Sequence, residues 1–394
     1  NSILYNYLEQ QNWFQLFNMI FDTCNVNLNN IDKDQLVIPF SEYIKQEIFT
    51  QVKELKNISV SAKTIEEYIA DCKSILSRMT WKCLIIELHQ FKQHNELKGN
   101  DGHERYLDFI KRKYSSIDKI KSFYLKYPVL LRLLINRSQD FINSTMEMFK
   151  FIDGDYHKIS NYFGLSDNKI IGFETSKGDT HQRGRSVSKL IFSNSKELIY
   201  KPRNLYIQKA FSSLINYFNE NSGLMDLRTN NVYYAEKFTV EEVITHKECT
   251  NKNQLNNYYY RIGELIVLLG IVGATDMHSE NIIASGEYPY IIDCETLLSQ
   301  YEYDLEDNAN LEVINDHILR LFAIGILPTK GFDNNVEGKG VDVSGLGGGQ
   351  EEIYPTKVLV PINVYTDEMR FEYKYDAVIK ANENLPKFKY YSRI

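Results

Sequence analysis

Residues 275–298, TDMHSENIIASGEYPYIIDCETLL, carry the pattern from which the fold of this chain is predicted. Two short apolar runs, at residues 282–284 and 290–292, flank a turn at residues 286–289, which is typical of a β-hairpin. A largely apolar helix is expected directly before this stretch, at residues 255–274. The polar loop between helix and hairpin is then placed as a kinase-like fold places its catalytic loop.

The polar residues of this stretch have the spacing of a phosphotransfer centre. Asp276 lies five residues before Asn281, and Asp293 and Glu295 follow the second apolar run. Phosphoryl transfer from ATP needs a carboxylate to orient the acceptor hydroxyl and oxygen ligands to hold Mg²⁺. We therefore predict Asp276 as catalytic and Asn281, Asp293 and Glu295 as metal ligands, with strand alternation turning both later carboxylates to one side. His278 is expected to contact substrate or to give a supporting hydrogen bond. The alternative is a solvated loop with an Asp at a strand end.

A lysine on an upstream strand would complete such a phosphate site. Lys201 lies in the predicted strand ELIYKPR, residues 197–203. A buried lysine is unfavourable unless it is paired, so a phosphate or an acidic partner is expected. Glu220 and Glu236 are both possible partners, and a lysine at an exposed strand end is the alternative reading.

The loop SKGDTHQRGRS, residues 176–186, lies where a kinase has its phosphate-covering loop. Its two glycines allow backbone N–H groups to approach phosphate, and its arginines suit phosphate recognition. Its Asp–x–His pair suits proton transfer, because a carboxylate can orient the histidine. The loop is thus predicted to act on a phosphorylated product as well as on ATP; an exposed polar hairpin loop is the alternative. The residues concerned are Gly178, Asp179, His181, Arg183, Gly184 and Arg185.

The hydrophobic periodicity divides the chain into three regions. Residues 1–165 are expected to be helical, because apolar residues recur three and four positions apart. Residues 166–248 are expected to form a kinase-like N-lobe with the phosphate loop and the Lys201 strand. Residues 249–394 are expected to form an incomplete C-lobe with the catalytic and metal-binding loops. The Gly-rich run GKGVDVSGLGGGQ, residues 338–350, lies where a kinase has its activation segment and is predicted to be a flexible loop; contact of Asp342 or Ser344 with substrate is the alternative.

Composition limits the classes of protein that fit. The chain has 394 residues, 43% of them hydrophobic and 25% charged, as in an ordinary soluble globular protein. A net charge of −7 argues against non-specific nucleic-acid binding. The five cysteines lack zinc-ligand spacing, and no apolar run is long enough to cross a membrane, so a cytoplasmic location is expected. The chain starts at Asn1 and reads as a fragment of something longer.

Four segments together resemble the dehydratase domain of class II lanthipeptide synthetases, the LanM family: GDTHQRGRSVSKLIF, LIYKPR, the 275–298 stretch and DVSGLG. The resemblance implies an α+β fold with a two-lobed, lipid-kinase-like core embedded in additional helices. It implies that ATP and Mg²⁺ serve to phosphorylate Ser and Thr of a ribosomally made precursor peptide with a leader. Elimination of the phosphate would then give dehydroalanine or dehydrobutyrine. By motif, phosphorylation would use Lys201, Asp276, His278, Asn281, Asp293 and Glu295, and elimination would use Asp179 and His181.

Two features of that family are not found in this sequence. One is a later segment whose Arg and Thr serve elimination, and the other is a zinc-dependent cyclase domain, which is expected in the full-length protein. The sequence therefore leaves two alternatives for this chain alone: phosphorylation followed by elimination of the phosphate, or phosphorylation without efficient elimination. Two other functions compete with the dehydratase: a small-molecule or lipid kinase with the same core, and a non-catalytic member that only binds peptide.

Overall fold

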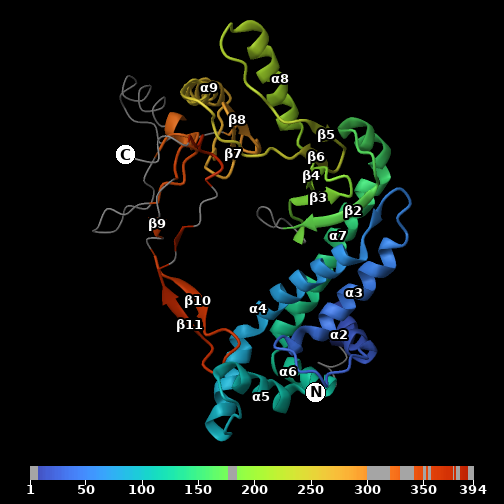
Figure 1. The fold of residues 1–394 in the computed structure, drawn as a ribbon. Helices are drawn as coiled ribbons and strands as arrows, with labels where there is room; N and C mark the ends of the chain where they lie inside the picture. The colour runs from blue at the N-terminus through green and yellow to red at the C-terminus, as the bar shows by residue number, and fades with distance from the viewer. Residues whose placement is uncertain are drawn as a thin grey trace. The chain divides into compact units, whose positions relative to one another are not determined.

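The computed structural model describes residues 8–175, 184–299, 320–328, 341–348, 352–353, 356–375, 377–378 and 382–388. Its architecture is α+β, so the predicted fold class is confirmed at that level (Figure 1). The chain divides into two compact units. Unit 1 comprises Asn1–Pro202 and Leu359–Glu372, and unit 2 comprises Arg203–Val358 and Tyr373–Ile394. The three-part division drawn from the sequence stays a prediction.

Helices make up most of unit 1. Long helices form here because the apolar faces of α4 and α7 pack together and because their ends are capped: the Ser61 side chain accepts from the Thr64 N–H, and α7 stops at Gly164 in a left-handed conformation (φ 67°). The helical prediction for the N-terminal region is confirmed. The helices are α2 Asn12–Thr23, η1 Gln35–Val37, α3 Ile38–Val52, α4 Ala62–His94, α5 Gly102–Tyr114, α6 Ile117–Lys126 and α7 Pro128–Phe163.

Four strands of unit 1 lie side by side in the order β1 Ser59–Val60, β2 Lys169–Glu174, β3 Ser188–Phe192 and β4 Glu197–Lys201. Strand β1 is parallel to β2, and the other pairs are antiparallel, with Ser188 opposite Tyr200. One face is packed against the helices, where Phe173 contacts the rings of Tyr68 and Phe149. The strands predicted in NKIIGFET, VSKLIF and ELIYKPR are confirmed.

A hairpin of β10 Val358–Ile362 and β11 Arg370–Lys374 supplies the late segment of unit 1. Its tip packs against the early helices through Asp367, a buried carboxylate that pairs with Lys92 at 2.9 Å and with Arg105 at 3.1 Å. Arg105 and Asp367 are distant in sequence, so no local pattern indicates this pair.

The described residues of unit 2 form α8 Tyr206–Asn221, α9 Lys252–Ile271 and three strand pairs. The pairs are β5 Val232–Tyr234 with β6 Thr239–Glu242, β7 Ile282–Ser285 with β8 Tyr288–Ile291, and β9 Glu352–Ile353 with β12 Ala377–Val378. The predicted helix and hairpin around residues 255–292 are confirmed. They share one core, in which Leu265 and Leu269 of α9 pack with Met277, Ile282 and Ile324. The core holds the polar loop after α9 in place.

No helix within the described ranges combines the length and the apolar character that crossing a membrane requires.

Candidate functional site

The loop after α9 holds Asp276 in an unusual backbone conformation. Asp276 has φ 63°, in the left-handed region that residues other than glycine rarely adopt. Its neighbour Met277 donates a backbone hydrogen bond to Ile324 at 2.7 Å, and the Asn281 side-chain amide donates to the Asp276 carbonyl at 2.8 Å. Such a conformation costs about 1–3 kcal/mol and persists only where surrounding contacts fix it. These contacts leave the Asp276 side chain 61% exposed, on a firmly held backbone.

His278 and Asn281 lie beside Asp276. The Nδ1 atom of His278 accepts a hydrogen bond from the Glu280 backbone N–H at 3.1 Å, so a neutral ring carries its proton on Nε2. That Nε2 is 3.8 Å from Asp276 Oδ1 and 3.4 Å from Asn281 Nδ2. The structure thus brings together the three residues that the sequence singled out in this loop.

Asp293 and Glu295 follow the hairpin and face one shared cation. Strand β8 ends at Ile291, so the two carboxylates lie in a turn rather than on the strand as predicted. The turn is closed by Asp293 Oδ1, which accepts from the Glu295 backbone N–H at 3.1 Å. The guanidinium of Arg203 pairs with Glu295, and its Nη2 is 3.9 Å from Asp293 Oδ2. The carboxylates point to the same side, as predicted, but a turn and an arginine bring this about instead of strand alternation.

The turn and the Asp276 loop are joined by backbone contacts. The Ile292 N–H donates to Asn281 O at 3.0 Å, and the Thr275 N–H donates to Thr296 O at 3.2 Å. Asp276, Asn281 and the two later carboxylates therefore belong to one hydrogen-bonded local structure within unit 2.

These residues fit a magnesium ion that is completed by nucleotide phosphates. Among the described residues, no group of three or more His, Cys, Asp or Glu could by itself hold a metal. Mg²⁺ is commonly bound through one or two carboxylates together with substrate phosphates and waters, so a full protein cage is not required. Asp293 and Glu295 supply the carboxylates. The side-chain nitrogen of Asn281 donates to the Asp276 carbonyl, so its Oδ1 would be the atom that faces a metal ion.

The Gly-rich segment lies against this loop. The Ser279 N–H donates to Val343 O at 3.0 Å, and His278 and Ser344 form an isolated β-bridge. A Cβ atom on Gly345 would lie 2.7 Å from Met277 O, so only glycine allows this approach. The prediction of a flexible loop is therefore wrong for residues 341–348, which contact the loop after α9 from one side.

Comparison with known proteins places the chain in a family. Residues 127–392 match the family model described as "Domain of unknown function (DUF4135)". The chain belongs to the DUF4135 family. DUF4135 is the domain associated with class II lanthipeptide synthetases, so the resemblance to the LanM family is confirmed. The chain is also 27% identical, over 343 residues, to the lacticin 481/lactococcin biosynthesis protein LcnDR2 of Lactococcus lactis subsp. lactis. The aligned part is 84% of this chain and 36% of that protein, so the chain spans about a third of its relative.

Lys201 of this DUF4135 chain is buried on one face of the unit 1 sheet. Lys201 is only 6% exposed. The alternative prediction, a lysine at an exposed strand end, is therefore wrong. The side chains of successive residues in a strand point to opposite faces of the sheet, so Lys201 and Tyr200 are on different faces. Tyr200 is on the face that packs against the helices. Lys201 is therefore on the other face of the sheet, and its predicted phosphate partner stays a prediction.

The phosphate-covering loop of the DUF4135 chain is described only at its ends. Gly178, Asp179, His181 and Arg183 lie outside the described residues. Gly184 has φ 71°, and a Cβ atom there would lie 2.9 Å from the Cβ of Asp140 on α7. Arg185 pairs with Glu147 of α7, with 2.7 Å between Nη2 and Oε2, and this bond raises the pKa of Arg185. The chain leaving the loop is thus anchored on α7.

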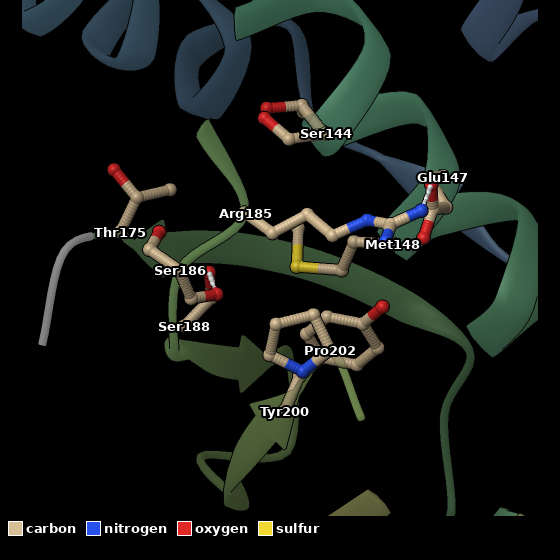
Figure 2. A pocket seen from close by; sticks show the side chains of 10 residues that line it. Ser144, Glu147, Met148, Thr175, Arg185, Ser186, Ser188, Tyr200 and Pro202 are labelled. Atoms are coloured by element: carbon tan, nitrogen blue, oxygen red, sulfur yellow. Dashed lines mark hydrogen bonds and ion pairs between the residues drawn. The ribbon is translucent and has the colours of Figure 1, made fainter. Parts of the chain in front are cut away.

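A small pocket lies at this anchor point (Figure 2). Figure 2 shows the Arg185 side chain reaching across it to Glu147, with Ser186 on one side and Tyr200 below. Because Tyr200 lines it, the pocket is on the helix-covered face of the sheet, away from Lys201. It is therefore not the site predicted to hold nucleotide phosphates.

Two site residues were missed from the sequence. Glu147 lies between Met146 and Met148 on α7, and no local pattern pairs it with Arg185. Arg203 is the last residue of ELIYKPR, and the strand pattern assigns it no role. Burial lowers the pKa of its guanidinium, and Asp293 and Glu241 oppose this effect.

Proposed function

We propose that this chain is a lanthipeptide dehydratase, which phosphorylates Ser and Thr of a precursor peptide with ATP and Mg²⁺ and then eliminates the phosphate. The observation that carries the proposal is the joined arrangement of Asp276, His278 and Asn281 with Asp293 and Glu295. Membership of the DUF4135 family and the likeness to a lantibiotic biosynthesis protein support it.

Phosphorylation would use the exposed carboxylate of Asp276. This carboxylate would accept a hydrogen bond from a peptide hydroxyl and would orient that oxygen for attack. His278 would support this carboxylate through its Nε2 proton. Asn281, Asp293 and Glu295 would hold Mg²⁺, and the ion would neutralise charge on the ATP phosphates when bound. Lys201 would bind the α- and β-phosphates.

Elimination would follow on the phosphorylated side chain. A base removes the proton on Cα, the Cα–Cβ double bond forms, and the Cβ–O bond breaks to release phosphate. We assign the base to the Asp179–His181 pair, because a carboxylate-oriented histidine suits proton transfer near neutral pH. The loop glycines and Arg183 would bind the phosphate, as cationic and N–H groups stabilise a departing anion.

The proposal extends to the fold and the partners. The antiparallel strands β2 to β4, with Lys201 on the last, and the order of α9, polar loop and β7–β8 hairpin support a kinase-like core. The partners would be a precursor peptide with a leader and, in the full-length protein, a C-terminal cyclase domain. The reaction would take place in the cytoplasm.

The mass of a precursor peptide after reaction tests the proposal. The protein is incubated with Mg²⁺, ATP and a peptide that carries a leader and a Ser- and Thr-containing core. Loss of about one water per modified residue would support dehydration, and a stable phosphopeptide would support phosphorylation without elimination. An unchanged peptide, in the presence of the matching leader, would contradict the proposal. ATP turnover on a lipid or small alcohol in that case would identify a kinase of another substrate.

A further inference from the structure

Arg203 occupies a defined position beside the predicted metal ligands. Its backbone carbonyl accepts a hydrogen bond from the Thr239 hydroxyl at 2.9 Å, which fixes the start of the side chain. From there the guanidinium reaches Glu295 and comes within 3.9 Å of Asp293 Oδ2. The side chain is only 26% exposed, so it is held between protein groups rather than extended into water.

A nearby cation, either a metal ion or the Arg203 guanidinium, stabilises the paired carboxylates of Asp293 and Glu295. The Asp293–Glu295 turn holds them close together, and like charges at that range repel. Two carboxylates and one guanidinium give the cluster a net charge of −1. A divalent ion in place of the guanidinium would bring the charge to zero. Both cations therefore compete for the same oxygen atoms.

Arg203 also has another carboxylate in its surroundings. Glu241 on β6 acts electrostatically on the same guanidinium and is itself buried, at 3% exposure. Asn230 donates to Glu241 Oε2 at 2.8 Å, so that carboxylate is held in place. Arg203 would consequently keep a negative neighbour if it left Asp293 and Glu295.

We infer that Arg203 is a place-holder cation, which neutralises Asp293 and Glu295 in the metal-free protein and is displaced by Mg²⁺ when nucleotide binds. The inference rests on the proposed function, since it takes these carboxylates as the metal ligands. Displacement frees a planar guanidinium next to the incoming phosphates, and arginine binds phosphate oxygens through two parallel N–H groups. Arg203 thereby couples metal binding to phosphate binding, as a positioning residue of the site.

Mn²⁺ binding without nucleotide tests this inference. Mn²⁺ replaces Mg²⁺ because its free and bound forms are distinguished by electron paramagnetic resonance. Arg203→Gln should bind Mn²⁺ about tenfold more tightly than the unaltered protein, because the competing charge is gone. Arg203→Lys keeps a cation and should retain the weak binding. Arg370→Gln is the matched control, since Arg370 pairs with Glu372 in the β11 strand of unit 1, outside this cluster.

Equal Mn²⁺ affinities of Arg203→Gln and the unaltered protein would overturn the inference. If peptide phosphorylation remained intact in that case, the proposed function would stand. Absence of Mn²⁺ binding in all variants, with and without a non-hydrolysable ATP analogue, would overturn both.

A measurement on the unaltered protein covers the case in which Arg203→Gln does not fold. In protein labelled with ¹⁵N-arginine, the Nε–H resonance of Arg203 is assigned by its loss in Arg203→Lys. The resonance should shift when Mg²⁺ and the ATP analogue bind together. A resonance that stays in place at saturation would overturn the inference.

Discussion

The side-chain amide of Asn281 donates a 2.8 Å hydrogen bond to the backbone carbonyl of Asp276. This bond joins the two ends of the candidate catalytic loop and helps to hold Asp276 at φ 63°. Under the proposed function the Asp–x–x–x–x–Asn spacing would have two physical roles: the nitrogen of Asn281 would fix the backbone of Asp276, and its oxygen would bind the metal ion.

Asn281→Asp separates these two roles. Aspartate keeps an oxygen ligand but has no N–H donor for the Asp276 carbonyl. We expect Mn²⁺ binding in the presence of an ATP analogue to be retained, while peptide phosphorylation falls by about a hundredfold because the carboxylate is misplaced. Asn281→Ala should lose both. Phosphorylation at the normal rate by Asn281→Asp would show that the hydrogen bond does not position Asp276.

The backbone conformation of Asp276 predicts different stabilities for two variants that are both expected to be inactive. Asn tolerates the left-handed region better than Ala does, because its side chain can hydrogen-bond locally. Asp276→Ala should therefore have a free energy of unfolding about 1 kcal/mol lower than Asp276→Asn, although both are inactive. Urea unfolding of the two variants measures the difference. If the alanine variant is as stable as the asparagine variant, the left-handed conformation is not the one populated in solution.

Gly184→Ala should destabilise the protein by about 1–3 kcal/mol, because alanine is strained at positive φ and its Cβ would meet Asp140. Gly154→Ala is the matched control: it lies within α7 with no atom near its added Cβ. That variant should be neutral or slightly more stable, since alanine favours helix. Denaturant unfolding distinguishes them, and equal stabilities would contradict the anchoring of the loop on α7.

Glu87 gives unit 1 a predictable sensitivity to acid. Burial alone would raise the pKa of this carboxyl, but hydrogen bonds from Lys113, Lys126 and Tyr127 outweigh it and lower the pKa to about 2. Because the folded-state pKa lies below the unfolded one, this contribution to stability is present above about pH 4.5 and is lost as the pH falls toward 2.

Glu87→Gln tests that contribution. The variant should be less stable at neutral pH and should lose less stability than the unaltered protein between pH 4.5 and pH 2. Urea unfolding followed by circular dichroism at several pH values gives the free energy of unfolding of each protein as a function of pH. If the free energy of unfolding depends on pH equally in both proteins, Glu87 does not cause the acid sensitivity.

Local patterns predicted the elements around the candidate site. The apolar periodicity of residues 255–274 and the two apolar runs around Gly286 correspond to α9 and to β7 and β8. These predictions hold because each element buries a face that its own sequence defines. The spacing of Asp276, His278 and Asn281 could likewise be read directly, since one short loop contains all three.

Contacts between distant segments could not be predicted in this way. Arg105 and Asp367 are far apart in sequence, and the residues around either one do not indicate that the two form an ion pair. Arg203 follows a strand, yet its role depends on a turn ninety residues later, in which Asp293 and Glu295 face it. The glycines of residues 341–348 suggested flexibility, whereas Gly345 is required by the close approach of Met277. Tertiary contacts decided each of these cases.

Phosphate transfer by Asp276→Asn tests the central claim most directly. The unaltered protein, Asp276→Asn and the control Glu280→Gln, whose side chain is exposed in the same loop, are each incubated with Mg²⁺, γ-³²P-labelled ATP and the precursor peptide. Label and dehydrated product should form with the unaltered protein and with Glu280→Gln, and neither should form with a folded Asp276→Asn. Unimpaired labelling or dehydration of the peptide by Asp276→Asn would contradict the assignment of this loop as the phosphotransfer centre.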